Sequence, residues 1–125
     1  FHTTRPDIYK EVEETATFQL EFPSGALAAC HTSFGINMNY LQANCEKGWF
    51  KMEPFSSYNG NKGSSPQGPI DFPLQSQQAK QLDDDTDALM KGLSLIAPGE
   101  EGLRDIRVVE AVYKSVANGG KTIKL

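Results

Sequence analysis

Polar and apolar residues alternate along the first half of the chain in short runs that are typical of strands. Every second residue is apolar in residues 15–22, which predicts a strand with one buried face. Similar patterns predict strands in residues 26–34, 40–45 and 49–53. The connections between these runs are far too short for parallel crossovers, so we expect an antiparallel meander.

The alternation assigns each side chain of the meander to one of two faces. The apolar face would carry Phe18, Leu20, Phe22, Ala28, Cys30, Ala43, Cys45, Phe50 and Met52. The other would carry Thr17, Gln19, Glu21, His31, Ser33, Gln42, Asn44, Lys51 and Glu53. Helices cover only the apolar side of such a sheet. The open polar face therefore meets either water or another copy of itself, and we assign Gln19, Glu21, His31 and Ser33 as its interface residues.

A region rich in Ser, Gly, Pro and Asn follows in residues 56–75. We expect a long loop there, with a short strand at residues 69–72. Ser76 then caps a helix that runs to about Lys91 and stops at Gly92. The inner line of this helix is predicted to be Ala79, Leu82, Thr86, Leu89 and Leu93.

A second helix is predicted after Pro98, with Glu100 and Glu101 in its first turn, where the helix dipole favours negative charge. Its apolar stripe consists of Leu103, Ile106, Val109, Val112 and Val116. Asn118, Gly119 and Gly120 end the helix, and residues 122–125 are expected to form a terminal strand. The whole pattern predicts an α+β domain over residues 1–125, with a mainly antiparallel, open-faced sheet and helices packed on one face.

Composition narrows the class of protein. The 125 residues suit one domain, and 38% hydrophobic and 22% charged residues are ordinary for a globular chain. A net charge of −4 without a basic cluster argues against nucleic acid or an anionic membrane as partner. Cys30 and Cys45 both fall in predicted strands, so buried thiols are favoured over a functional pair. Cytoplasm is the default location, and an export signal upstream of Phe1 would make it periplasmic.

Few residues suggest chemistry on their own. Asp83 and Asp87 lie one helical turn apart and could share a hard cation, but a solvated helix face is favoured and no metal site is assigned. A catalytic role for His31 would need an orienting carboxylate, for which Glu21 across the hairpin is the candidate; a structural or interface histidine is favoured. Residues 58–63 lack the context of a phosphate loop, and the chain contains no GxGxxG fingerprint. No catalytic or cofactor-binding residue is therefore assigned.

Three segments together resemble a known family. They are ETATFQLEFPSGALAA in residues 14–29, CEKGWFKMEP in residues 45–54, and residues 77–125, which contain QQAKQLDDDTDALMKG and PGEEGLRDIRVVEAVYKSVANGGKTIKL. In this order they resemble the C-terminal domain of the Gfo/Idh/MocA oxidoreductases, closest to the glucose–fructose oxidoreductase branch.

The resemblance implies a two-domain enzyme that moves hydride between NAD or NADP and a hydroxyl carbon of a sugar or cyclitol. The N-terminal Rossmann domain and the catalytic motifs of such an enzyme do not occur in residues 1–125, so this chain alone would bind no cofactor and be inactive. It would supply the substrate-side wall, with Phe34, Asn37, Asn39 and Tyr40 toward the sugar, and a homo-oligomer interface. An ordinary polar loop at residues 34–40 stays an equal alternative. A freestanding sugar-binding or protein-interaction module of the same fold, without catalysis, stays open too.

Overall fold

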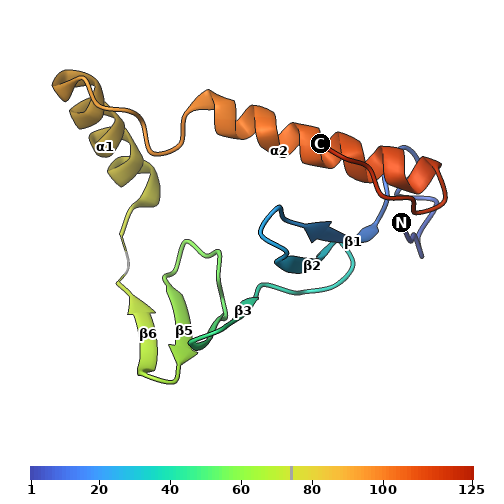
Figure 1. The fold of residues 1–125 in the computed structure, drawn as a ribbon, viewed down its shortest axis with the longest axis horizontal. Helices are drawn as coiled ribbons and strands as arrows, with labels where there is room; N and C mark the ends of the chain where they lie inside the picture. Colours follow the sequence, from blue (N-terminus) through green and yellow to red (C-terminus); the bar gives the residue numbers. More distant parts are fainter. Residues whose placement is uncertain (74) are drawn as a thin grey trace. The chain divides into compact units, whose positions relative to one another are not determined.

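The fold combines antiparallel strands with two helices, in a computed structural model that describes residues 1–73 and 75–125 (Figure 1). The elements in chain order are β1 (Thr15–Glu21), β2 (Leu27–Ser33), β3 (Leu41–Cys45), β4 (Gly48–Met52), β5 (Asn61–Ser65), β6 (Gly68–Phe72), α1 (Gln77–Lys91) and α2 (Gly99–Ala117). The α+β class is confirmed. The chain divides into two compact units, of which unit 1 is Phe1–Met38 with Ala97–Leu125, and unit 2 is Asn39–Ile96.

Unit 1 contains the β1–β2 hairpin, whose register matches the predicted faces. Phe18 lies opposite Cys30 and Leu20 lies opposite Ala28, so these apolar side chains share one face because facing residues of an antiparallel pair point the same way. Ala16, which continues this row, is 3% exposed. The hairpin turn requires Gly25, whose φ of 83° lies in the left-handed region.

Helix α2 lies along this hairpin in unit 1 and covers part of its apolar face (Figure 1). Val109 and Val112 contribute to the contact, whereas Leu103 and Ile106 at the start of the predicted stripe are 53% and 58% exposed. The predicted end is confirmed, because α2 is capped by Asn118 and followed by two glycines with positive φ. The strand predicted at residues 122–125 is wrong: in the described part of the chain these residues pair with no strand, and apolar alternation alone cannot make a ladder.

Unit 2 contains a four-stranded antiparallel sheet in the order β3–β4–β5–β6. Leu41 faces Met52 across β3 and β4, as the shared apolar face requires, and Met52 is 8% exposed. The long loop predicted for residues 56–75 is partly wrong, because β5 occupies its middle and pairs with both β4 and β6. Strand β5 has the sequence NKGSS and carries no apolar alternation, so the pattern of side chains gave no sign of it.

Two further expectations need correction. The predicted single meander is divided into two sheets, since β2 and β3 are not paired with each other within the described residues; residues 34–40 separate them. The predicted inner line of α1 is exposed, with Leu82 at 68% and Leu89 at 70%, although the cap at Ser76 and the stop at Gly92 are confirmed. Cys45 is exposed and Cys30 half-buried, so burial of both thiols was also wrong.

Candidate functional site

A buried carboxylate organises the N-terminal part of unit 1. Glu14 directly precedes β1 and is 5% exposed. Its Oε2 accepts hydrogen bonds from the backbone N–H and the hydroxyl of Thr4, both at 2.8 Å, and from the backbone N–H of Arg5 at 3.2 Å. Its Oε1 accepts from the Arg5 guanidinium at 3.0 and 3.3 Å. We call Thr4, Arg5 and Glu14 the Glu14 clamp.

The hydrogen bonds of the clamp favour the ionised form of Glu14. The Thr4 hydroxyl is the largest single cause, and burial acts against it by penalising the charge. The backbone N–H groups of Thr4 and Arg5 and the Arg5 side chain act in the same direction as the hydroxyl. Together they lower the pKa of Glu14 from 4.5 to about 2. The clamp is therefore a charged structure at neutral pH.

The clamp also contacts the segment that follows β2. The carbonyl of Glu14 accepts a hydrogen bond from the Phe34 N–H at 2.9 Å. A Cβ atom added to Gly35 would lie 2.2 Å from Glu14 Oε1, so any larger residue there would have to displace this hydrogen-bonded carboxylate. The Gly35 N–H donates to the Ser33 hydroxyl at 3.0 Å. The ring of Phe34 stacks on that of Tyr9 with centroids 5.8 Å apart.

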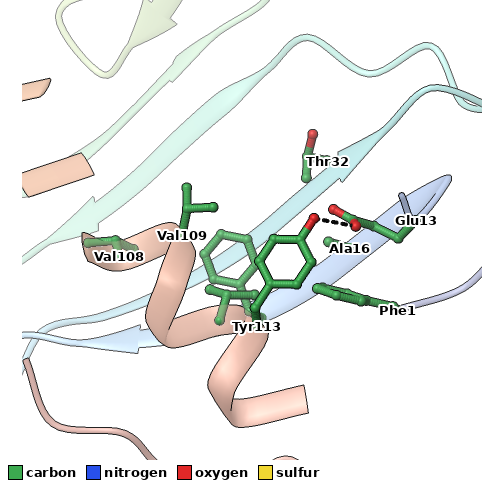
Figure 2. Close-up of a pocket in the computed structure, with 9 residues that line it drawn as sticks. Phe1, Glu13, Ala16, Thr32, Val108, Val109 and Tyr113 are labelled. Atoms are coloured by element: carbon green, nitrogen blue, oxygen red, sulfur yellow. Dashed lines mark hydrogen bonds between the residues drawn. The ribbon is translucent and has the colours of Figure 1, made fainter. Parts of the chain in front are cut away.

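A small pocket of about 150 Å³ lies between α2 and the β1–β2 hairpin of unit 1. Most of its lining is apolar, from Phe1, Ala16, Phe18, Val108, Val109 and Val112, with Thr32, Glu13 and Tyr113 as its polar members. Figure 2 shows the Tyr113 hydroxyl directed at Glu13, to which it donates a hydrogen bond of 2.6 Å. This hydrogen bond, with burial and the charge of Glu13 adding to it, raises the pKa of Tyr113. The pocket thus holds one polar pair at the edge of an apolar hollow, an arrangement that packs the helix against the hairpin.

The four residues predicted to face a sugar are divided between the two units. Phe34 and Asn37 belong to unit 1, whereas Asn39 and Tyr40 belong to unit 2. Phe34 is 76% exposed and Tyr40 is 51% exposed. The side chain of Asn39 is engaged within unit 2: its Oδ1 accepts from the N–H groups of Phe55 and Ser56, and its Nδ2 donates to the Ser56 carbonyl. Their assignment to substrate stays a prediction.

The polar face of the hairpin carries the predicted interface residues. Gln19, Glu21 and His31 are exposed and Ser33 is half-buried. Thr17, and not Glu21, lies opposite His31, and the Thr17 hydroxyl is 3.0 Å from His31 Nδ1. Glu21 lies opposite Leu27 at the other end of the hairpin, so the carboxylate considered as an orienting group for His31 is not beside it. The interface assignment itself stays a prediction.

The described residues offer little to a metal or a dinucleotide. No group of three or more His, Cys, Asp or Glu side chains converges in residues 1–73 and 75–125. Asp84 and Asp87 of the acidic run are instead paired with Lys80 and Lys91, one turn away on the same helix. Every strand pair in this part of the chain is antiparallel, so it lacks the βαβ turn that holds a dinucleotide's pyrophosphate. These residues do not fit an NAD or NADP site.

Sequence reasoning missed the Glu14 clamp, although a signal for it was present. The alternation that points Ala16 and Phe18 inward continues backward to Glu14. An acid at an inward position needs hydrogen-bond donors around it, because a buried charge is costly without them. Thr4 and Arg5, ten and nine residues earlier, could not be identified as those donors by spacing.

Comparison with known proteins places the chain in a family. No protein-family model matches it. The crystal structure of aldose–aldose oxidoreductase from Caulobacter crescentus, complexed with glycerol, superposes with a TM-score of 0.86 and 36% sequence identity. The match covers 99% of this chain. This chain is a C-terminal domain of the Gfo/Idh/MocA family.

This Gfo/Idh/MocA domain spans 39% of the length of the Caulobacter enzyme. The match confirms that the antiparallel α+β architecture is the one the resemblance implied. No helix of the domain's described residues has the length and apolar character needed to cross a membrane.

Proposed function

We propose that this domain forms the substrate-side wall and a subunit interface of an NAD- or NADP-dependent oxidoreductase that acts on a hydroxyl carbon of a sugar or cyclitol. The observation that carries the proposal is the 36% identity, over 99% of the chain, to an aldose–aldose oxidoreductase. Because this chain covers 39% of that protein, the cofactor and the hydride-transfer residues would belong to a separate Rossmann domain. The reaction would then take place in the whole protein and not in residues 1–125 alone.

The exposed apolar side chains support a domain that packs against further protein. Among the described residues, only Ala16 and Met52 are buried hydrophobic residues. Large side chains such as Leu89, Met90 and Ile96 in unit 2 are 70%, 81% and 83% exposed. Exposed apolar side chains, where they gather into a patch, mark interaction sites in soluble proteins. The Rossmann domain and a second copy of the protein are the partners that the proposal supplies.

The substrate wall is proposed for residues 34–40, where two exposed aromatic rings and two amides occur together in the sequence. Aromatic rings suit the apolar face of a sugar, and amides suit its hydroxyl groups. Phe34 and Asn37 are the stronger candidates, because the amide of Asn39 is already hydrogen-bonded to Phe55 and Ser56. The ammonium of Lys51 lies 5.8 Å from the centroid of the Tyr40 ring.

A direct test is turnover by the protein as its source cells make it. We expect NAD⁺ or NADP⁺ to be reduced in the presence of an aldose or a cyclitol, followed as absorbance of the reduced nicotinamide. Saturable binding of sugars without any turnover would favour the non-catalytic module instead. Turnover of neither class, with no sugar binding by calorimetry, would remove the proposal.

The interface has its own test in the open face of the β1–β2 hairpin. Replacing Gln19 and His31 with glutamate adds charge to two exposed positions without touching the Ser33 hydroxyl, which bonds to Thr15 and Gly35. We expect sedimentation velocity to show a smaller assembly, because like charges would meet across the interface. Gln81→Glu on the exposed surface of α1 is the matched control. An unchanged mass for the double variant would exclude this face as the interface.

A further inference from the structure

The Glu14 clamp controls Phe34 from two sides. On the backbone side, the Glu14 carbonyl accepts the Phe34 N–H, and the carboxylate lies against the Cα of Gly35. On the side-chain side, the same carboxylate binds the Arg5 guanidinium, whose NH2 group donates to the Tyr9 hydroxyl at 3.0 Å. Tyr9 in turn stacks on Phe34, with 20° between the ring planes.

The stacked arrangement leaves a ring available on the surface. Phe34 remains 76% exposed although one of its faces is covered by Tyr9. An exposed aromatic ring is free to move unless its neighbours fix it, and a fixed ring binds a ligand at a lower entropic cost. Each contact that fixes this ring depends on Glu14. The Glu14 carboxylate binds Arg5, which holds Tyr9 against the ring. The Glu14 carbonyl holds the Phe34 backbone.

We propose that Glu14 is a positioning residue that holds the Phe34 ring as a stacking platform for the ring of a sugar substrate. The proposal rests on the proposed function, which puts residues 34–40 on the substrate side. Glu14 itself does not touch the sugar, because its carboxylate is enclosed by Thr4, Arg5 and Gly35. Its effect is on the orientation of Phe34 and therefore on substrate binding more than on the chemical step.

The test compares Glu14→Gln with Glu11→Gln, which changes an exposed glutamate of the same unit. Glutamine keeps the shape of Glu14 but lacks its charge. Its NH2 group would face the donor groups of Thr4 or Arg5 in place of an accepting oxygen. In the whole protein we expect hydrogen exchange at the Phe34 and Gly35 amides to rise by about tenfold. We expect KM for a cyclic aldose such as glucose to rise by about tenfold, with kcat within about twofold, since uniform binding is lost. Glu11→Gln should change neither.

A second substrate separates positioning from general loosening of the fold. Glyceraldehyde is an aldose without a ring, so it has nothing to stack on Phe34. Its KM should stay within about twofold in Glu14→Gln, because only stacking is lost. An equal rise for glucose and glyceraldehyde would overturn the platform, because a merely loosened domain would penalise both.

Milder variants keep the proposal testable if Glu14→Gln fails to fold. Thr4→Val removes one hydrogen bond to Oε2 and keeps the backbone donor, so the same changes are expected in smaller size. Thr4→Ser restores the hydroxyl and should return both exchange and KM to wild-type values.

The outcomes distinguish this proposal from the proposed function. Unchanged exchange at Phe34 in the variants would overturn the positioning role even if the enzyme oxidises sugars. Faster exchange with an unchanged KM for glucose would overturn the platform and leave the oxidoreductase intact. If the wild-type protein oxidises no aldose or cyclitol, the proposed function fails and the sugar platform fails with it, whatever the exchange data show.

Discussion

Each unit of the domain contains a polar side chain that connects separate segments by several hydrogen bonds, and the two side chains differ in charge. In unit 1, the Glu14 carboxylate accepts from Thr4 and Arg5 and lies beside Gly35. In unit 2, the Asn39 amide bonds to the backbone of Phe55 and Ser56, just after β4. A carboxylate can only accept, so it gathers donors, whereas an amide satisfies an acceptor and donors together. The hydrogen bonds of Glu14 in unit 1 are therefore sensitive to protonation, and those of Asn39 in unit 2 are not.

The helices differ in the same two units. Helix α2 places Val109 and Val112 over the hairpin of unit 1, whereas Leu82 and Leu89 of α1 are exposed. Both helices have apolar residues at helical spacing. Periodicity therefore predicts that a helix has an apolar face, but the partner of that face depends on tertiary structure.

The largest difference between the units should appear in acid. The pKa of Glu14 is lowered from 4.5 to about 2, so its stabilisation of unit 1 is complete above 4.5 and is lost as pH falls through about 2. We expect the protection of residues 1–38 against hydrogen exchange, relative to the intrinsic rate at each pH, to fall over this range while the contacts of Asn39 keep their protection. Glu14→Gln should remove this acid response in unit 1. Equal acid sensitivity of both units, or a response that survives in the variant, would break the comparison.

A glycine in unit 2 should show the next largest effect. A Cβ added at Gly63 would lie 2.2 Å from the Lys51 carbonyl, which belongs to the paired strand β4 and cannot move aside. We expect Gly63→Ala to lower the free energy of unfolding by about 1–3 kcal/mol in urea titration. Gly102→Ala is the control, because Gly102 has open space around it and lies within α2; it should stabilise by about 0.5–1 kcal/mol.

Removing the uncharged Asn39 amide tests whether the stability of unit 2, unlike that of unit 1, is independent of pH. Asn39→Ala deletes three hydrogen bonds, but water can replace part of them because the site is exposed. We expect a loss of about 1 kcal/mol in the free energy of unfolding. The loss should be the same at pH 7 and pH 4. A loss that depends on pH would mean that a charged group also stabilises the hydrogen bonds of Asn39.

The smallest effect is expected at the start of α1. The Ser76 hydroxyl accepts from the Ala79 N–H at 3.4 Å, a long hydrogen bond. Ser76→Ala should therefore lower the free energy of unfolding by about 0.5 kcal/mol, the lower end for an N-cap. Ser94→Ala, outside both helices, is the matched control. A larger loss than for Asn39→Ala would show that α1 contributes more to unit 2 than its exposed apolar face indicates.

Local rules predicted the elements of this fold that depend on neighbouring residues. The register of Phe18 with Cys30 followed from alternation, and the ends of both helices followed from Ser76, Gly92 and Asn118. Strand β5 could not be predicted this way. It depends on Gly63 lying close to the β4 backbone, a contact between distant residues with no signature in the side-chain pattern.

The residues of the candidate site also differ in whether local sequence rules could predict their surroundings. Exposure of Gln19, Glu21 and His31 could be predicted, because strand alternation decides which face a residue occupies. The partners of Glu14 could not, because Thr4 and Arg5 reach it through an irregular segment. Asn39 was assigned to substrate from its residue type, and only the fold reveals that its amide already has partners in unit 2.

The close approach of Gly35 to Glu14 also constrains how this sequence can diverge. A methyl group at position 35 would meet Oε1 at 2.2 Å, so alanine there would displace the carboxylate unless position 14 held a shorter acid. Aspartate is shorter by one methylene group and would withdraw the carboxylate from the loop. We therefore expect the two positions to vary together among homologous domains: glutamate with glycine, or aspartate with a small side chain. A larger residue at position 35 would then be found only in domains where position 14 has already changed.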